Sequence, residues 1–374
     1  MLEDFVRPEI RALEAYVPGR SIEEIRQEYG IEKVIKMASN ENPLGTSPLV
    51  QEVLARHAGE AFRYPAGGNP RLVKAIARYL GLPESRIAVG NGSDEIIDMI
   101  IRIMTTPGRD NIVCFEPCFS LYPIQSLING VEVRREPLPS DFVFDFDKLY
   151  AHVDENTRLV FVTAPDNPSG YCPRPGEIRR LAEKLPGDCL LVVDEAYIHF
   201  AAEEGETEAD WSLLRQKDVP ANVAFIRTFS KCYGLAGLRI GVGILPEFLA
   251  GYYWRARLPF SVNILAEEAA ITALDDDVFR QETIETVRKG RKELSLALTE
   301  MGCTVYPSRA NFLMFTPPAG HPALELYEAL LRRGVIVRAL KSYEMPQNIR
   351  VSVGSPEENK IFLKATREIL GGGS

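Results

Sequence analysis

The stretch Cys189-Leu190-Leu191-Val192-Val193-Asp194-Glu195-Ala196-Tyr197 contains five consecutive apolar residues followed by two carboxylates. An apolar run without alternation is typical of a strand buried on both faces, as in a parallel sheet covered by helices. Helical patterns, for example at residues 94–104 and 175–185, separate several such runs. The other runs are residues 86–89, 111–115, 158–163, 222–226 and 239–244. The alternation predicts an α/β fold with a mostly parallel sheet covered by helices.

The length of 374 residues indicates more than one domain, because single cores stop growing at about 250–300 residues. After about residue 264 the pattern changes to two long helices, residues 264–274 and 278–301, and a short strand at 311–315. The capping box Ser355-Pro356-Glu357-Glu358 predicts a final helix. We therefore expect four segments. They are an N-terminal arm (1–36), a large domain (37–265), a smaller α+β domain (266–370) and a Gly-Gly-Gly-Ser tail (371–374).

The composition disfavours several classes of function. The formal net charge is −9, and an acidic protein repels phosphate backbones, so nucleic acid is not an expected partner. The six cysteines form no CxxC pair and the four histidines are scattered, so we expect free thiols and no metal site. No apolar run approaches the roughly 18 residues of a membrane span, and no signal-peptide pattern is present. We therefore expect a cytoplasmic protein.

Polar clusters follow several of the predicted strands, where open parallel sheets bind ligands. Gly90-Asn91-Gly92-Ser93-Asp94-Glu95 joins a strand to a helix. Its glycines and the free N–H groups of the helix start favour an anion such as phosphate, although a tight turn with a capping residue explains the same pattern. Asp194 ends a buried strand, where a carboxylate needs a positive partner. A protonated ring nitrogen of a cofactor is one such partner, and a helix-capping role is the alternative.

Two further clusters contain a lysine and an asparagine. Lys231 lies in Thr228-Phe229-Ser230-Lys231-Cys232-Tyr233-Gly234, among apolar residues and glycines. Partial burial lowers the pKa of a lysine from about 10.4, and the neutral amine attacks carbonyl groups. A surface lysine in a glycine-rich loop is the alternative. Asp166-Asn167-Pro168-Ser169-Gly170 follows another strand and is equally compatible with a plain Asn-Pro turn.

Taken in order along the chain, these motifs resemble the fold-type-I pyridoxal-phosphate aminotransferases, and within them the histidinol-phosphate aminotransferases. The resemblance covers nearly the whole chain. Its most specific stretches are residues 39–45, 63–65, 90–95, 194–197 and 230–241. Some positions depart from the family pattern: Asp166, Ser169, Val242 and Glu344 replace the more frequent Asn, Thr, Tyr and Gly. None of these changes removes a catalytic group.

The resemblance implies roles for individual residues toward pyridoxal 5'-phosphate. Lys231 would hold the cofactor covalently as a Schiff base, Asp194 would pair with the ring nitrogen, and Phe119 would stack on the ring. Tyr197 and Asn167 would bind the 3-hydroxyl oxygen of the ring. The phosphate would be held by Gly92, Ser93, Asp94, Thr228, Ser230 and Arg239, and by Tyr64 of a second subunit in a homodimer. The substrate-binding residues would be Tyr16, Asn40, Arg338 and Arg350.

The activity implied by the resemblance is transamination of histidinol phosphate with 2-oxoglutarate, a step in histidine biosynthesis. Two related activities stay open. An aromatic amino acid aminotransferase would use the same residues, and a threonine-phosphate decarboxylase shares the motifs but breaks a different bond. A binding protein that has kept only the fold is disfavoured, because both Lys231 and Asp194 are present.

Overall fold

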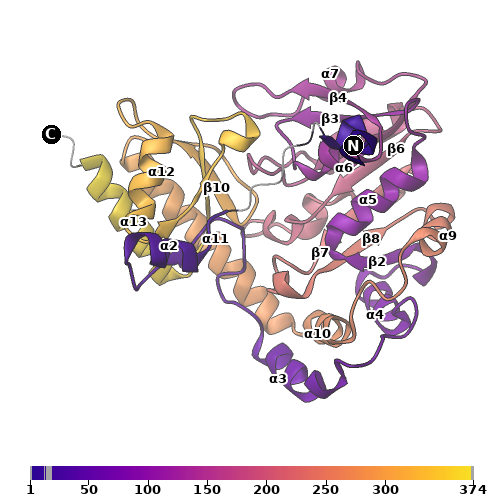
Figure 1. The fold of residues 1–374 in the computed structure, drawn as a ribbon, viewed down its shortest axis with the longest axis horizontal. Helices are drawn as coiled ribbons and strands as arrows, with labels where there is room; N and C mark the ends of the chain where they lie inside the picture. Colours follow the sequence, from indigo (N-terminus) through magenta and orange to yellow (C-terminus); the bar gives the residue numbers. More distant parts are fainter. Residues whose placement is uncertain (1, 12, 14–18, 372–374) are drawn as a thin grey trace.

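Seven strands form the central sheet, in the order β2-β8-β7-β6-β5-β3-β4 (Figure 1). The computed structural model describes residues 2–11, 13 and 19–371. The strands are β1 (Ile35–Lys36), β2 (Ile87–Asn91), β3 (Asn111–Glu116), β4 (Glu132–Pro137), β5 (Thr157–Thr163), β6 (Leu190–Asp194), β7 (Val223–Thr228), β8 (Ile240–Ile244), β9 (Thr304–Val305), β10 (Phe312–Thr316), β11 (Val335–Ile336), β12 (Arg338–Ala339) and β13 (Ile349–Ser352). Within the central sheet, β8 is antiparallel to both of its neighbours and the other pairs are parallel.

Helices cover both faces of this sheet. The α-helices are α1 (Pro8–Arg11), α2 (Ile22–Tyr29), α3 (Pro48–His57), α4 (Pro70–Leu80), α5 (Gly92–Met104), α6 (Leu121–Ile128), α7 (Phe146–Tyr150), α8 (Pro175–Lys184), α9 (Glu247–Ala256), α10 (Ile264–Asp275), α11 (Asp277–Glu300), α12 (Ala323–Leu331) and α13 (Pro356–Gly371). Short 3₁₀ helices are η1 (Leu2–Phe5), η2 (Ala58–Glu60), η3 (Glu84–Arg86), η4 (Ile198–Phe200), η5 (Glu208–Asp210), η6 (Leu213–Arg215), η7 (Ala236–Leu238) and η8 (Lys341–Tyr343).

The continuous apolar strands arise because alternate side chains enter two different cores. In β6, Val192 packs into the core beneath α5, α6 and α9, whereas Leu191 and Val193 pack into the core beneath α4, α8 and α10. Successive side chains of a strand point to opposite faces, so a strand covered on both faces needs apolar residues at every position. The expected α/β architecture, with a mostly parallel sheet between helices, is confirmed.

The C-terminal part forms a second lobe, which Figure 1 shows in orange and yellow around β10, α12 and α13. Its sheet has the order β12-β13-β10-β9 and is antiparallel throughout. The N-terminal segment joins this lobe: Ile25 of α2 packs with Leu331 and Ile336, and β1 pairs with β11. The domain boundaries at residues 36/37 and 265/266 stay a prediction. The helix α10, which spans the second of these boundaries, packs against α3 and α4.

The predicted elements can be compared directly with the observed ones. Each predicted strand of the large domain overlaps an observed strand, with ends that differ by one or two residues. The capping box of α13 is present, because Ser355 Oγ accepts from Glu358 N at 3.3 Å and Glu358 Oε2 accepts from Ser355 N at 2.8 Å. The strand β4 was not predicted, because four of its six residues are charged. Among the residues described, no helix is both long and apolar enough to cross a membrane.

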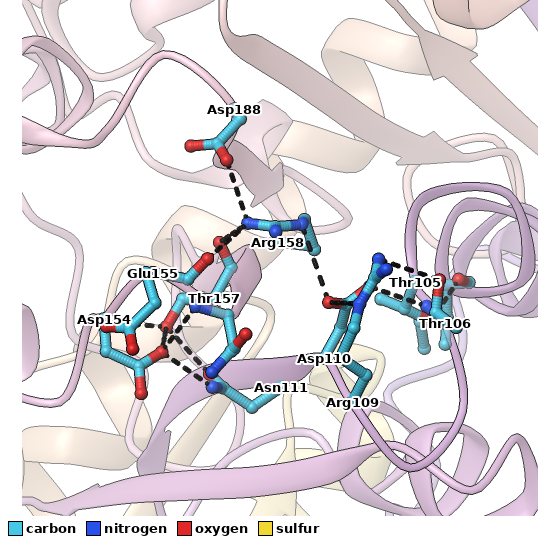
Figure 2. A network of polar contacts seen from close by, with 12 residues as sticks. Thr105, Thr106, Arg109, Asp110, Asn111, Asp154, Glu155, Thr157, Arg158 and Asp188 are labelled. Atoms are coloured by element: carbon cyan, nitrogen blue, oxygen red, sulfur yellow. Dashed lines mark hydrogen bonds and ion pairs between the residues drawn. The ribbon is translucent and has the colours of Figure 1, made fainter.

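A charged cluster fixes the edge of the central sheet at which β3 and β5 begin (Figure 2). The buried Asp110 lies 2.9 Å from Arg109 and 3.7 Å from Arg158, and Arg158 also pairs with Asp188 at 3.0 Å. In the same cluster Asn111 donates to Asp154 at 3.0 Å. This edge is opposite the one at which the parallel strands end, so these charges lie away from the motifs that follow the strands.

Candidate active site

A cavity of about 270 Å³ lies where β5, β6 and β7 end and α5 begins. The predicted residues that line it are Ser93, Asp94, Phe119, Asn167, Asp194, Tyr197, Thr228, Ser230, Lys231 and Arg239. The other lining residues are Ser39, Glu41, Thr163, Ala196 and Ala236. Residues that are more than 190 positions apart in the chain therefore meet here, because the parallel strands bring their carboxyl ends to one edge of the sheet.

Lys231 follows β7 and extends its amine into the cavity. Its Nζ donates to the carbonyl oxygen of Ser39 at 3.0 Å and lies 5.8 Å from the centre of the Tyr197 ring. Burial lowers the pKa of Lys231 to about 8, and the positive charge of Arg350 acts in the same direction. About a tenth of the amine is therefore neutral at pH 7, and a nucleophile or proton acceptor requires the neutral form.

Asp194 is a buried carboxylate at the end of β6. Its Oδ2 accepts from Tyr122 Oη at 2.8 Å and its Oδ1 accepts from Ala196 N at 3.0 Å. Within the described part of the chain no basic side chain forms an ion pair with it, and burial raises its pKa to about 6. A carboxylate in this position is stabilised by a cationic group that enters the cavity.

Hydroxyl groups and a guanidinium surround the N-terminal end of α5. Thr228 Oγ1 accepts from Ser230 N at 3.1 Å, and Arg239 pairs with Asp94 at 3.0 Å. The first turn of an α-helix also has N–H groups without intrahelical partners, which attract anions. Together with the hydroxyl of Ser93, these groups form a donor set suited to a phosphate ester.

Glycine is required at two positions around this donor set. Gly92 has φ +78°, and a Cβ there would lie 2.4 Å from Arg239 Nη2. A Cβ on Gly241 would lie 2.2 Å from the backbone nitrogen of Ser93. Both distances are far below van der Waals contact, so a side chain at either position would displace Arg239 or separate β8 from α5.

Tyr197 and Asn167 lie on the side of the cavity that faces the C-terminal lobe. The Tyr197 hydroxyl accepts from Asn40 Nδ2 at 3.1 Å, and burial raises the pKa of Tyr197 to about 12. Asn167 Oδ1 accepts a hydrogen bond from Arg350 Nη1. Asn40 and Arg350 therefore contact residues that line the cavity.

The two predicted substrate arginines lie on neighbouring strands of the small sheet. Arg350 is buried in β13, where its Nη2 donates to Ala38 O at 3.0 Å, and its guanidinium lies 5.1 Å from the centre of the Phe312 ring. Its Nε has no hydrogen-bond partner among the described residues. Arg338 is half-buried in β12, and its Nη2 donates to Ser342 Oγ at 3.5 Å.

Tyr64, one of the predicted site residues, does not line this cavity within one chain. Tyr64 is 80% exposed and stacks on Phe260, with ring centres 4.8 Å apart. It was expected to act in a neighbouring subunit, and exposure leaves it accessible for that role. Tyr16 lies outside the residues that the structure describes.

Tyr122 and Thr163 are polar site residues that sequence reasoning missed. Tyr122 Oη hydrogen-bonds to Thr163 Oγ1 at 2.9 Å as well as to Asp194. Tyr122 follows Phe119 by three residues at the start of α6, and nothing in the local sequence distinguishes it from an ordinary buried tyrosine. Ser39 and Glu41, by contrast, lie within the motif at residues 39–45 and could have been predicted from it.

The structure shows the local setting of three departures from the family pattern. Asp166 and Ser169 bond to each other, with Ser169 Oγ donating to Asp166 Oδ2 at 2.6 Å, which closes the turn that holds Asn167. Glu344 adopts φ +60°, a left-handed conformation that favours glycine. This backbone conformation explains why glycine is frequent at that position in the family. Glu344 does not line the cavity.

Three larger hollows occur elsewhere in the described part of the chain. The first, of about 890 Å³, lies between the segment 198–209 and α11, and the second, of about 670 Å³, lies between α7 and α8. The third, also of about 670 Å³, lies between α11 and the segment 306–309. In the first, Arg215, Arg280 and Arg288 each pair with a neighbouring carboxylate. The smaller cavity at the strand ends is the candidate active site because it combines an activated lysine with an unpaired buried carboxylate.

The sequence model of the family "Aminotransferase class I and II" matches residues 32–365. The chain belongs to this family. Over 367 residues it is 55% identical to a histidinol-phosphate aminotransferase of Nitratidesulfovibrio vulgaris, with 98% of this chain and 97% of that protein covered.

Solved structures share the fold. Histidinol-phosphate aminotransferase from Sinorhizobium meliloti, in complex with pyridoxal-5'-phosphate, has a TM-score of 0.86 and 26% identity, covering 99% of this chain and 98% of that one. L-threonine-O-3-phosphate decarboxylase from Porphyromonas gingivalis has a TM-score of 0.77 and 23% identity, covering 90% of this chain and 100% of that one. The second similarity concerns the fold alone.

Proposed function

We propose that this protein is a pyridoxal-phosphate-dependent histidinol-phosphate aminotransferase. It would transfer the amino group of histidinol phosphate to 2-oxoglutarate and release imidazole acetol phosphate and glutamate. The observation that carries the chemistry is the position of Lys231 and Asp194 in one cavity. The 55% identity to a histidinol-phosphate aminotransferase over nearly the whole chain supports the choice of substrate.

The residues of the cavity fit pyridoxal phosphate. When bound, this cofactor supplies a carbonyl that condenses with amines and a protonated ring that withdraws electrons from the substrate carbon. Asp194 would pair with the ring nitrogen, because it is buried and no cation pairs with it among the described residues. Ser93, Thr228, Ser230 and Arg239 would hold the phosphate together with the first turn of α5, which begins at Gly92. Phe119 would cover the ring.

Lys231 would hold the cofactor and also move a proton. Its Nζ is held by the carbonyl oxygen of Ser39, and its pKa of about 8 leaves part of the amine unprotonated at neutral pH. Once the substrate amine has displaced it, the free Nζ would take the proton from the substrate carbon and deliver it to the cofactor carbon that is bonded to the same nitrogen. Tyr197 would donate a hydrogen bond to the 3-hydroxyl oxygen of the ring, with Asn40 supporting its hydroxyl.

Arg350 and Arg338 would bind the phosphate of the substrate. The Nε of Arg350 has no hydrogen-bond partner among the described residues. Arg338 lies directly opposite it on the neighbouring strand. Two guanidinium groups on one face suit a dianionic phosphate ester better than a single carboxylate, because together they supply two positive charges that also donate hydrogen bonds.

Two alternative activities are separated from this proposal by one experiment. An aromatic amino acid aminotransferase would use the same cavity, and a threonine-phosphate decarboxylase would bind a phosphate ester but release carbon dioxide. Steady-state rates of the purified holoenzyme with histidinol phosphate, phenylalanine and threonine phosphate distinguish all three. A higher kcat/KM for phenylalanine, or carbon dioxide release from threonine phosphate, would overturn the proposal.

The assembly and location of the enzyme are also part of the proposal. We infer a homodimer in which Tyr64 binds the cofactor phosphate of the other subunit. Its 80% exposure, and its stacking on Phe260 outside the cavity of its own chain, support this arrangement. We place the enzyme in the cytoplasm, where a biosynthetic aminotransferase meets its substrates.

A further inference from the structure

A buried charged cluster lies behind the candidate active site, where β6 and β7 end. Arg227 donates from Nε and Nη2 to the same oxygen of Glu195, at 2.9 and 2.6 Å. Nη2 also lies 2.9 Å from Glu208 Oε1, and Ser212 Oγ donates to the second oxygen of Glu195 at 2.6 Å. The side chains of Arg227 and Glu195 are only 6% and 1% exposed, so this is a fully desolvated ion pair.

The positions of this pair connect it to the site. Glu195 directly follows Asp194, and Arg227 directly precedes Thr228. Successive side chains of a strand point to opposite faces, so Asp194 and Thr228 face the cavity while Glu195 and Arg227 meet behind it. The backbones are joined at the same level, because Glu195 N donates to Ile226 O at 2.8 Å.

Stability alone does not explain this cluster. Burying an ion pair generally costs as much in desolvation as it returns in attraction, and apolar replacements are often neutral or stabilising. Here the cost is increased, because Arg227 Nη1 has no hydrogen-bond partner among the described residues. The cluster does not touch the cavity, so it takes no direct part in binding or proton transfer.

We infer that Arg227 and Glu195 are positioning residues that fix the separation between Asp194 and the loop Thr228–Lys231. The ion pair joins the ends of β6 and β7, and Glu208 and Ser212 tie both ends to η5 and η6. The inference rests on the proposed function, because pyridoxal phosphate needs its ring nitrogen and its phosphate bound at a fixed distance. Catalytic geometry tolerates displacements of only about 0.5 Å.

Two variants test this role. Arg227→Lys keeps the charge but cannot donate from two nitrogens in the fixed geometry of a guanidinium. The combined replacement Glu195→Leu, Ser212→Ala and Arg227→Met removes the buried charges and leaves Glu208 paired with Arg215 at 2.7 Å. The control is Asp110→Asn, which weakens the ion pairs of a buried carboxylate at the opposite edge of the same sheet (Figure 2).

Four quantities are measured: the dissociation constant of pyridoxal phosphate for the apoprotein, kcat, KM for the amino donor, and the thermal midpoint of the apoprotein. We expect both variants at the cluster to lose about tenfold or more in cofactor affinity and in kcat, with KM little changed. The charge-free variant should keep its thermal midpoint. The control should lose thermal stability and keep wild-type cofactor affinity.

Several outcomes would overturn the inference. Wild-type cofactor affinity and kcat in both folded variants would show that the cluster positions nothing. An equal loss of cofactor affinity in Asp110→Asn, or failure of both cluster variants to fold, would assign the cluster a purely structural role. Failure of the wild-type apoprotein to bind pyridoxal phosphate is a different result, because it refutes the proposed function itself.

Discussion

The hydroxyl of Tyr122 donates a hydrogen bond to Asp194 Oδ2 across 2.8 Å inside the core. Thr163 bonds to the same hydroxyl at 2.9 Å, so the carboxylate is held on one side by a two-residue chain. Burial raises the pKa of Asp194 to about 6, and the Tyr122 hydrogen bond opposes that shift. Tyr122 therefore helps Asp194 to stay ionised, which is the state needed to keep a ring nitrogen protonated.

The first prediction concerns Asp194→Asn. An amide cannot hold the ring nitrogen protonated, so the variant should bind pyridoxal phosphate but lose about 100-fold or more in kcat, equivalent to about 3 kcal/mol. Tyr122→Phe should lose about tenfold, because a hydrogen bond to a charged group contributes about 1.5–3 kcal/mol. Steady-state kinetics with saturating cofactor measure both. Near-normal turnover of Asp194→Asn contradicts the assigned role.

The second prediction concerns Lys231→Ala. Without the Nζ amine the protein should lose the covalent link to the cofactor and all measurable transamination. Borohydride reduction of the wild-type holoenzyme, followed by peptide mapping, should place the cofactor on Lys231. Lys36, whose Nζ pairs with Glu41 at 3.1 Å, is the matched control, and Lys36→Ala should keep the link. A label on any lysine other than Lys231 rejects the assignment.

The third prediction concerns His199, whose pKa burial lowers to about 4. In the unfolded chain a histidine binds its proton below about pH 6.5. Between these two values the unfolded state takes up the proton and the native state does not, so native stability falls as the pH falls. From pH 7 to pH 5 the loss from this group is about 2 kcal/mol. Urea unfolding at several pH values should show a weaker acid dependence in His199→Gln, and parallel curves for the two proteins would exclude this role.

The fold could be predicted where one physical signal dominates. The strands β5, β6 and β7 are buried on both faces, so their apolar runs are continuous and easy to recognise. The strand β4 is charged and lies at the edge of the sheet, so it has no apolar signal. The insertion of β8 between β2 and β7 could not be predicted either, because the chain order of the strands does not specify their order in the sheet.

The site could be predicted where a residue follows a strand within a recognisable motif. Lys231, Asp194 and Asn167 were found in this way, and the cavity brings all three together. Supporting groups such as Tyr122 and Arg227 carry no such signal. Their partners lie 72 and 32 residues away in the chain, so only the folded structure identifies those contacts.

The fourth prediction concerns the homodimer. Tyr64→Phe and Lys231→Ala should each be impaired alone, because each removes a group from every site. A mixed dimer should recover one working site of two, in which an intact Lys231 meets an intact Tyr64 from the other subunit. Refolding equal amounts of the two variants together and measuring activity tests this. If activity is not recovered, or if sedimentation shows that a monomer is fully active, the active sites are not shared between subunits.

The fifth prediction concerns substrate choice and rests on the pairing of Arg338 with Arg350. These residues are directly opposite in the antiparallel pair β12 and β13, and opposite residues project to the same face of a sheet. Arg350 is already committed through Nη1 and Nη2 to Asn167 and Ala38, so only its Nε lacks a partner among the described residues. A dianionic phosphate therefore needs Arg338 as its second cation.

Loss of Arg338 should accordingly affect phosphate-bearing substrates most. In Arg338→Ala, kcat/KM for histidinol phosphate should fall by about 30- to 1,000-fold, which corresponds to about 2–4 kcal/mol of transition-state binding. The weak rates with phenylalanine and tyrosine should change much less, because they offer no phosphate. Arg333→Ala, which removes a half-exposed arginine paired with Glu368 at 3.9 Å, should keep wild-type kinetics.

If Arg338→Ala leaves the histidinol phosphate rate untouched, or if wild type prefers phenylalanine, Arg338 does not bind phosphate. Substrate choice must then be sought in other polar residues that line the cavity, such as Glu41 and Ser39.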